Sequence, residues 1–158
     1  MAELDGTARA LARIPSGLFV LCAGREPPGL AMLVSFVQQV GFQPPAISVA
    51  LNKQRDRALA LLRAERSFCL AVIGDGDRAL LARYAGGAGD GDPFEGVDAA
   101  TAANGVRYPA AACAHLVCEL RAEVDCGDHW LLCAEVSGGD AVAAGKPWVH
   151  LRKNGLSY

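Results

Sequence analysis

Hydrophobic residues along the chain gather into short runs of strand length, separated by turns rich in glycine, proline and aspartate. The pattern predicts buried or half-buried strands at 18–22, 30–34, 47–51, 68–73, 115–124, 129–136 and 148–152. In the clearest of them Leu116, Cys118, Leu120, Ala122 and Val124 face one way, and Val117, Glu119, Arg121 and Glu123 face the other. Such alternation is typical of an antiparallel strand with one face against a core and one in water.

Helical spacing is confined to three short segments, 4–13, 57–64 and 77–84, and Asp56 or its neighbour is expected to cap the second. Turns are expected at 24–29, 126–128 and 138–140, where glycine or proline is frequent. Polar residues at 35–41 interrupt two apolar segments, and Pro44-Pro45 leads in extended backbone to the next strand. Residues 86–113, rich in glycine, alanine and aspartate, are expected to form one long loop.

The expected fold is mainly β with short helices, a closed or split β-barrel rather than a doubly wound sheet. Strands outnumber helices, and hairpin turns are frequent. The 158 residues fit a single domain, 1–158, which is long enough to bury a core without disulfide or metal staples.

Composition and charge narrow the classes of function. Because 52% of the residues are hydrophobic and 20% charged, the chain is globular, and part of its apolar surface is expected to face a partner subunit. The net charge is −2 and the cations are scattered, which argues against a nucleic-acid partner. No run is long enough to span a membrane and no export signal is recognisable, so a cytoplasmic location is expected. There the six cysteines are expected to be mainly reduced core residues, with a metal site or a catalytic thiol as minor alternatives.

Three polar stretches are candidates for ligand binding. Ser35–Gln39 forms a turn whose backbone N–H groups suit the pyrimidine edge of a flavin, although an ordinary polar crossover fits the same residues. Asn52–Arg57 joins a strand end to a helix start with cations, which indicates either a phosphate site or a solvated loop capped by Asp56. Asp128-His129 lies at a hairpin, where a histidine can contact a ligand or simply lie on the surface.

A fourth stretch, Gly74-Asp75-Gly76-Asp77-Arg78-Ala79, is similar to a dinucleotide fingerprint because it follows a strand and opens a helix. Asp75 and Asp77 would place negative charge where a pyrophosphate should lie. The helix also leads into a glycine-rich loop rather than a second parallel strand. A structural turn is therefore favoured there.

Seven segments, taken in order, resemble those of the flavin reductase-like family of FMN-binding split barrels. They are the opening strand Ile14–Leu21, the flavin-ring loop Met32–Gln39 with Pro44-Pro45, the phosphate loop Asn52–Arg55, the strand Phe68–Val72, the mid-loop anchor Asp92–Phe94, the hairpin Gly127–His129 with Glu135-Val136, and the C-terminal strand Pro147–Gly155. The chain departs from the family at Leu33 and at Arg55–Arg57, where small polar residues are common, and at Ala71, where asparagine is common. Contacts to FMN in the ring and phosphate loops are then expected from the backbone and from cations.

The resemblance implies a bound FMN, contacted by Leu33, Val34, Ser35, Phe36, Gln38, Gln39, Asn52, Lys53 and Arg55. Within this set the two cations would hold the phosphate, and the serine with the two glutamines would edge the ring. His129 is the expected catalytic residue, close to the ring or to the nicotinamide. No metal ligand is implied.

The implied activity is that of an FMN-dependent NAD(P)H:flavin oxidoreductase. NADH or NADPH would deliver hydride to flavin N5, and the electrons would pass to free flavin, oxygen or a partner oxygenase. The resemblance also implies a homodimer with the flavin at the subunit interface. Two alternatives stay open: an FMN-binding electron carrier without NAD(P)H activity, and a dimeric split-barrel scaffold that has lost FMN.

Overall fold

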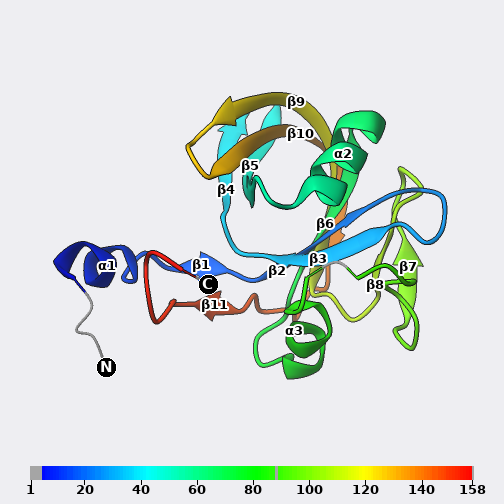
Figure 1. Ribbon diagram of the computed structural model, residues 1–158. Coiled ribbons are helices and arrows are strands. Elements are labelled where there is room, and N and C mark those ends of the chain that lie inside the picture. Colours follow the sequence, from blue (N-terminus) through cyan, green and yellow to red (C-terminus); the bar gives the residue numbers. More distant parts are fainter. Residues whose placement is uncertain (1–4, 88, 158) are drawn as a thin grey trace.

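Seven antiparallel strands form the main sheet in the computed structural model, which describes residues 5–87 and 89–157. Their order across the sheet is β3 (Leu30–Val34), β2 (Phe19–Ala23), β6 (Ser67–Val72), β9 (Ala114–Asp125), β10 (His129–Ala141), β5 (Pro45–Asn52) and β4 (Val37–Phe42). Figure 1 shows this sheet curling into a barrel, with β3 and β4 as its two ends. The mainly β barrel expected from the sequence is confirmed.

Three short helices accompany the sheet: α1 (Gly6–Leu11), α2 (Asp56–Glu65) and α3 (Arg78–Tyr84). Helix α2 packs against β2 and β6, and α3 packs against β3. Arg55 is the residue that caps α2, and it makes no side-chain capping hydrogen bond. Of the helix expected over 4–13, residue 4 lies outside the described residues; α1 itself begins after Asp5, whose side chain accepts from the backbone N–H of Thr7, and it ends at Leu11.

The start of α3 shows why the glycine-rich stretch before it is not a dinucleotide site. The carboxylate of Asp77 accepts a hydrogen bond from the N–H of Leu80 at 3.0 Å, so the helix is capped by its own side chain. The next strands, β7 (Ala99–Thr101) and β8 (Arg107–Pro109), form a separate antiparallel hairpin, not a parallel crossover. That hairpin lies inside the segment expected to be one long loop.

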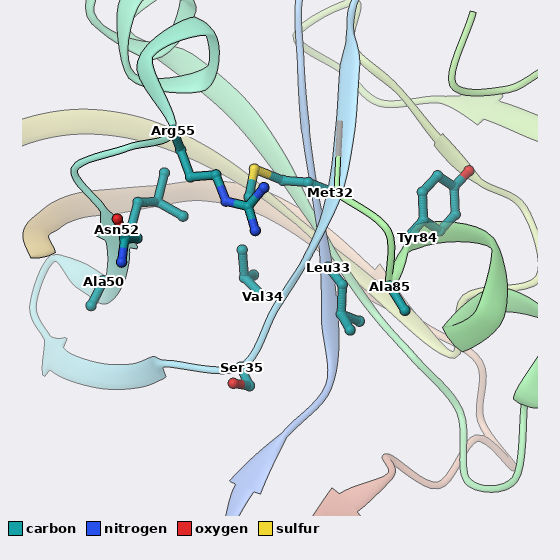
Figure 2. A pocket seen from close by; sticks show the side chains of 11 residues that line it. Met32, Leu33, Val34, Ser35, Ala50, Asn52, Arg55, Tyr84 and Ala85 are labelled. Atoms are coloured by element: carbon teal, nitrogen blue, oxygen red, sulfur yellow. The ribbon is translucent and has the colours of Figure 1, made fainter. Parts of the chain in front are cut away.

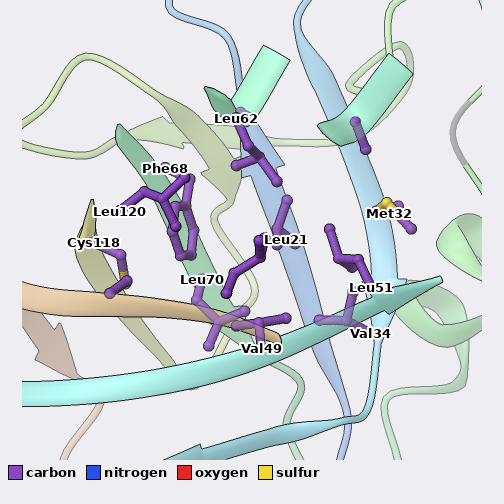
Figure 3. Packing of buried hydrophobic residues seen from close by; sticks show 14 of the residues in the cluster. Leu21, Met32, Val34, Val49, Leu51, Leu62, Phe68, Leu70, Cys118 and Leu120 are labelled. Carbon is purple, nitrogen blue, oxygen red and sulfur yellow. The ribbon is translucent and has the colours of Figure 1, made fainter. Parts of the chain in front are cut away.

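Two hydrophobic cores lie on opposite faces of β2 and β6. Inside the barrel, Leu21 and Leu70 pack with Leu62 of α2 and with side chains of β3, β5, β9 and β10 (Figure 3). On the outer face, side chains such as Cys22 and Cys69 pack under α3 and the β7–β8 hairpin. Burial on both faces explains why these two strands are continuous apolar runs instead of alternating ones.

Two segments that were expected to lie between strands, the polar stretch after Ser35 and the turn at 138–140, belong to strands in the structure. Residues 37–42 form β4, which pairs with β5 through the turn at Gln43-Pro44. Residues 138–140 lie within β10 and carry a register shift against β9. A Cβ on Gly139 would lie 2.4 Å from the carbonyl oxygen of His115, so glycine here permits a bulge with close backbone approach rather than a turn.

The far halves of β9 and β10 extend beyond the barrel. Val124 is 49% exposed and Ala122 is exposed, although both were expected to face the core, while Val117 is buried in the outer core. Ion pairs cover this hairpin, including Arg63 with Glu123 at 3.0 Å. Burial in β9 therefore does not alternate: Val117 and Cys118 are both buried, one in each core, and residues 121–125 are all exposed because the strand continues past the end of the barrel.

A projecting arm is formed by α1, β1 (Ser16–Gly17), β11 (Val149–His150) and the segment that follows β11, together residues 5–17 and 149–157. Figure 1 shows it to one side of the barrel. Gly155 lies so close to α1 that a Cβ there would meet the Cβ of Leu11 at 2.3 Å. Four of the large hydrophobic side chains that are most exposed lie on this arm: Ile14, Val149, Leu151 and Leu156.

The cysteines show no disulfide among them: Cys22, Cys69 and Cys118 are buried as expected, Cys113 and Cys133 are half-buried, and Cys126 is exposed. Within the described residues, no three His, Cys, Asp or Glu side chains are grouped as metal ligands. In the same residues, no helix is long and apolar enough to cross a membrane.

Candidate functional site

The ends of β3, β5 and α3, together with the start of α2, form a groove of about 130 Å³, named here the Arg55 groove. Sites that enclose a whole small ligand have about 300–1,000 Å³, so this groove suits one part of a larger ligand. Figure 2 shows Arg55 reaching from the start of α2 toward β3, with Asn52 on one side and Tyr84 on the other. The lining residues are Met32, Leu33, Val34, Ser35, Ala50, Leu51, Asn52, Arg55, Tyr84, Ala85 and Gly87.

Hydrogen bonds in the turn between β5 and α2 orient Arg55 toward the groove. Asn52 ends β5; its side-chain oxygen accepts from the N–H of Gln54 at 2.9 Å, and its carbonyl accepts from the N–H of Arg55 at 3.0 Å. No carboxylate among the described residues lies within ion-pair distance of Arg55, and no side chain caps the helix there. A free guanidinium beside an uncapped helix N-terminus is an anion site that suits a phosphate.

Lys53 does not share this groove with Arg55. Its Nζ lies 2.7 Å from Oδ1 of Asp125 and 4.8 Å from the centre of the Trp130 ring, on the β9–β10 side. The hydrogen bond from Lys53 lowers the pKa of Asp125 below its usual value. The two cations expected to hold one phosphate therefore lie on different sides of the turn, and only Arg55 lines the groove.

Arg57 is a structural cation. It donates to the carbonyl oxygens of Gly89 at 2.5 Å and Gly29 at 3.2 Å, and so ties the loop after α3 to the β2–β3 turn. That tie supports the chain around Gly87, which forms the wall of the groove against Arg55. The residue types at a charged helix start do not reveal which cation binds a ligand and which supports a loop.

The expected ring-loop residues divide between neighbouring pockets. Leu33, Val34 and Ser35 line the Arg55 groove from β3. Phe36 and Gln38 line a second pocket between the barrel and the arm, named here the arm cleft. Gln38 also lines a third, apolar pocket at the mouth of the barrel, and it is joined there by Gln39.

His129 begins β10 directly opposite Asn52 of β5, which places it at the edge of the Arg55 groove. Its Nδ1 lies 2.7 Å from Oδ1 of Asp128, and its ring meets the ring of Phe36 edge-on at 5.6 Å. The hydrogen bond from His129 lowers the pKa of Asp128, so the carboxylate is a stable partner that orients the imidazole. The side chain of His129 is 13% exposed and packed, not a freely moving surface group.

Tyr84, Ala85 and Gly87 line the groove although the sequence did not single them out. The Tyr84 hydroxyl donates to the carbonyl of Pro93 at 3.2 Å, and burial raises the pKa of Tyr84 to about 12, which keeps it neutral. These residues come from the end of α3, more than thirty positions after Asn52. In the sequence, the Gly86-Gly87 pair indicated that another segment of the chain could approach closely there. The sequence did not indicate that this segment carries Arg55.

Gly87→Ala is expected to weaken FMN binding. Gly87 has a φ of +83°, which disfavours any residue with a Cβ, and a Cβ there would lie 2.7 Å from Nη1 of Arg55. The guanidinium would have to move away from its present position. Fluorescence titration with FMN measures the effect; Gly86→Ala, with open space around its Cβ, is the control. Equal FMN affinities for both variants would contradict the role given to Gly87.

Residues 11–155 match the family model described as the flavin reductase like domain. The chain is 36% identical over 157 residues to diflavin flavoprotein A 1 of Synechocystis sp., covering 95% of this chain and 26% of the relative. It is 37% identical over 168 residues to putative diflavin flavoprotein A 3 of Nostoc sp., covering 99% and 27%. The chain thus spans about a quarter of the length of these curated relatives.

Two solved structures show the same fold. The NADH:FAD oxidoreductase SgcE6 of Streptomyces globisporus C-1027 superposes with a TM-score of 0.84 at 22% identity, covering 96% of this chain and 93% of that one. The styrene monooxygenase flavin reductase of Pseudomonas putida S12 superposes with a TM-score of 0.76 at 24% identity, covering 90% of each. With the family match over nearly its whole length, the chain belongs to the flavin reductase-like family, a family of flavin-binding oxidoreductases.

Proposed function

We propose that the protein is an FMN-dependent NAD(P)H:flavin oxidoreductase. The observation that carries the proposal is Arg55, a cation without a carboxylate partner among the described residues, at the uncapped start of α2 and lining the groove between β3, β5 and α3. The bound flavin would accept hydride from NADH or NADPH and pass electrons to free flavin, oxygen or a partner oxygenase. The cytoplasm is the place of action that we infer for it.

The residues present fit a flavin mononucleotide. Arg55 and the first N–H groups of α2 would hold the phosphate. Among the described strands β3 is an end strand that pairs with β2 alone, so alternate residues along it offer backbone N–H and C=O groups on its outer side. Those groups, with the hydroxyl of Ser35, would meet the polar edge of the ring. The departure from a small polar residue at Leu33 is then of little consequence, because backbone groups do the binding.

A second candidate function is a flavin-binding electron carrier that receives electrons from another protein. It is favoured by the relatives named diflavin flavoproteins, in which the matched segment makes up only about a quarter of the chain. Anaerobic titration of the flavin-loaded protein with NADH and with NADPH separates the two. Bleaching of the flavin absorbance supports the reductase, and an unchanged spectrum supports the carrier.

FMN is the proposed cofactor, not FAD. The Arg55 groove offers one guanidinium and one helix start, which suit a single phosphate. SgcE6, a structural neighbour, is described as an NADH:FAD oxidoreductase, so FAD is the real competitor. Mass spectrometry of the cofactor released from purified protein decides between them, and a predominance of FAD would refute the assignment.

We also propose a homodimer formed through the arm. The exposed side chains of Ile14, Val149, Leu151 and Leu156 all belong to the arm, which projects from the barrel (Figure 1). Burying such side chains against a second copy stabilises association by about 1.5–3 kcal/mol each.

The double variant Leu151→Glu/Leu156→Glu is therefore expected to be monomeric at micromolar concentration, whereas the wild type is dimeric. Light scattering measures the mass of both. Phe42→Glu is the control, because Phe42 is 88% exposed and belongs to β4, which is not part of the arm. A wild type that is monomeric when loaded with flavin would contradict the dimer.

A further inference from the structure

The two ends of the barrel differ in how they are closed. At the end where β5 finishes, α2 follows and packs Leu59 and Leu62 into the inner core, where both are buried. At the opposite end, where β2 and β5 begin, the inner core borders a pocket of about 350 Å³, named here the mouth pocket. Every strand of the main sheet except β3 contributes to its lining (Figure 1). The described residues therefore close one end of the barrel and leave the other open.

The apolar side chains around the mouth pocket are only half-buried. Among the described residues, six partly buried hydrophobic side chains pack against the inner core, and four of them line this pocket: Phe19, Val37, Leu116 and Val136. Leu70, which is fully buried, lines it as well. Burial of apolar surface is favourable in proportion to the area removed from water, so a ligand that covers these side chains would be stabilised.

The size and the place of the mouth pocket suit a small molecule. Ligand pockets commonly have about 300–1,000 Å³, and the mouths of β-barrels are among their usual locations. A barrel of about eight strands has room inside for side chains or for one small ligand. The arm, residues 5–17 and 149–157, contributes nothing to the lining, so the homodimer proposed above does not use this pocket.

The polar groups at the rim select the chemistry of the ligand. No charged side chain among the described residues lines the pocket, so an ion would lose its hydration there without gaining a partner. Gln38 and Gln39 line it, and their amide nitrogens are engaged: Nε2 of Gln38 donates to the carbonyl of Gln39 at 3.2 Å, and Nε2 of Gln39 donates to the carbonyl of Gly41 at 3.4 Å. The two amide oxygens are then the acceptors offered to a ligand.

We propose that the mouth pocket binds one neutral, apolar molecule that carries a single hydrogen-bond donor, such as a phenol or an indole. The apolar body of the ligand would pack against Phe19, Leu116 and Val136, and its N–H or O–H would donate to a glutamine at the rim. FMN and the nicotinamide nucleotides are anions and do not suit this lining. The site is therefore separate from the Arg55 groove and goes beyond the proposed reductase function.

Ligand-observed NMR titration of the FMN-loaded protein with indole tests the proposal. The wild type is expected to bind one indole per protomer in a saturable manner. Benzothiophene has nearly the same shape without the N–H, and it should bind about fivefold more weakly, as for loss of one hydrogen bond. Indole-3-acetate should bind about tenfold more weakly or worse, because its carboxylate would find no cation in the pocket.

Val136→Phe is expected to weaken indole binding about tenfold or more, because the added ring and the ligand compete for the same volume. The matched control is Val124→Phe, since Val124 is 49% exposed beyond the end of the barrel and does not line the mouth pocket. Its affinity for indole should equal that of the wild type. Val136→Thr keeps the size of the side chain and places a hydroxyl among apolar neighbours, so it should weaken indole binding several-fold without a change in packing volume.

Wild-type affinity for indole in both Val136 variants would overturn the site. Absence of saturable indole binding to the wild type would overturn it as well. If light scattering then showed that Val136→Phe lowers the mass of the oligomer, the pocket would be assigned to a contact with a second copy. None of these results depends on bleaching of the flavin by NADH or NADPH, which tests the proposed function separately.

Discussion

Replacing His129 with alanine is expected to slow bleaching of the bound flavin by NADH or NADPH about a hundredfold, the cost of a misplacement of roughly 1 Å in a reacting pair. The affinity for FMN should change little, because His129 lies beside the groove and is not one of its lining residues. The imidazole is fixed by Asp128 on one side and by Phe36 on the other, which suits a group that positions a second molecule against the ring.

The measurement is anaerobic stopped-flow absorbance at saturating nucleotide, with a separate titration for FMN. His115→Ala is the control, since His115 is also half-buried but stacks on Tyr108 at 4.3 Å in a different pocket. A lower melting temperature with an unchanged bleaching rate would show that His129 only stabilises the hairpin. That result would favour the electron carrier over the reductase.

Arg55→Ala is expected to weaken FMN binding by well over tenfold. A charge-assisted hydrogen bond is worth roughly 1.5–3 kcal/mol, and about 1.4 kcal/mol corresponds to a factor of ten. Riboflavin has no phosphate, so its affinity should be nearly the same in wild type and variant. Equilibrium titration with both ligands, monitored by flavin fluorescence, gives the two ratios.

Lys53→Ala is the informative partner of Arg55→Ala, because the two side chains leave the same turn in different directions. Lys53 is engaged with Asp125 and Trp130, so its loss should cost the hairpin an exposed ion pair and leave FMN affinity nearly intact. A larger loss of FMN affinity in Lys53→Ala than in Arg55→Ala would place the phosphate on the hairpin side. Equal losses of affinity for FMN and for riboflavin would mean that the phosphate lies away from both Arg55 and Lys53.

The sequence predicted the barrel well, because strand length and alternation are local properties. It also predicted α2 and the start of β10, which set the positions of Arg55 and His129. The wrong predictions concern residue types that occur in two kinds of structure. Gly138 and Gly139 indicated a turn but form a bulge inside β10, and the polar residues after Ser35 indicated a crossover but form β4.

The residues of the candidate site could be predicted from the sequence only in part, and for a different reason. Adjacent positions on a turn need not point to the same side, so the sequence could not separate Arg55 from Lys53. Tyr84 and Gly87 reach the groove through the packing of α3 against β3, which is a long-range contact. Arg152 comes from the far end of the chain and contacts Phe36 only because the arm folds back beside the barrel.

The burial of β2 and β6 on both faces sets an order in which parts of the molecule open. Strands enclosed by two cores release their amide protons only when the whole barrel comes apart, whereas elements with few buried contacts open locally. The arm, whose two-residue strands β1 and β11 pair only with each other, belongs to the second class. In a protomer whose arm is not covered by a second copy, fluctuations of the arm can therefore open the cleft while the Arg55 groove, built on β3 and β5, keeps its shape.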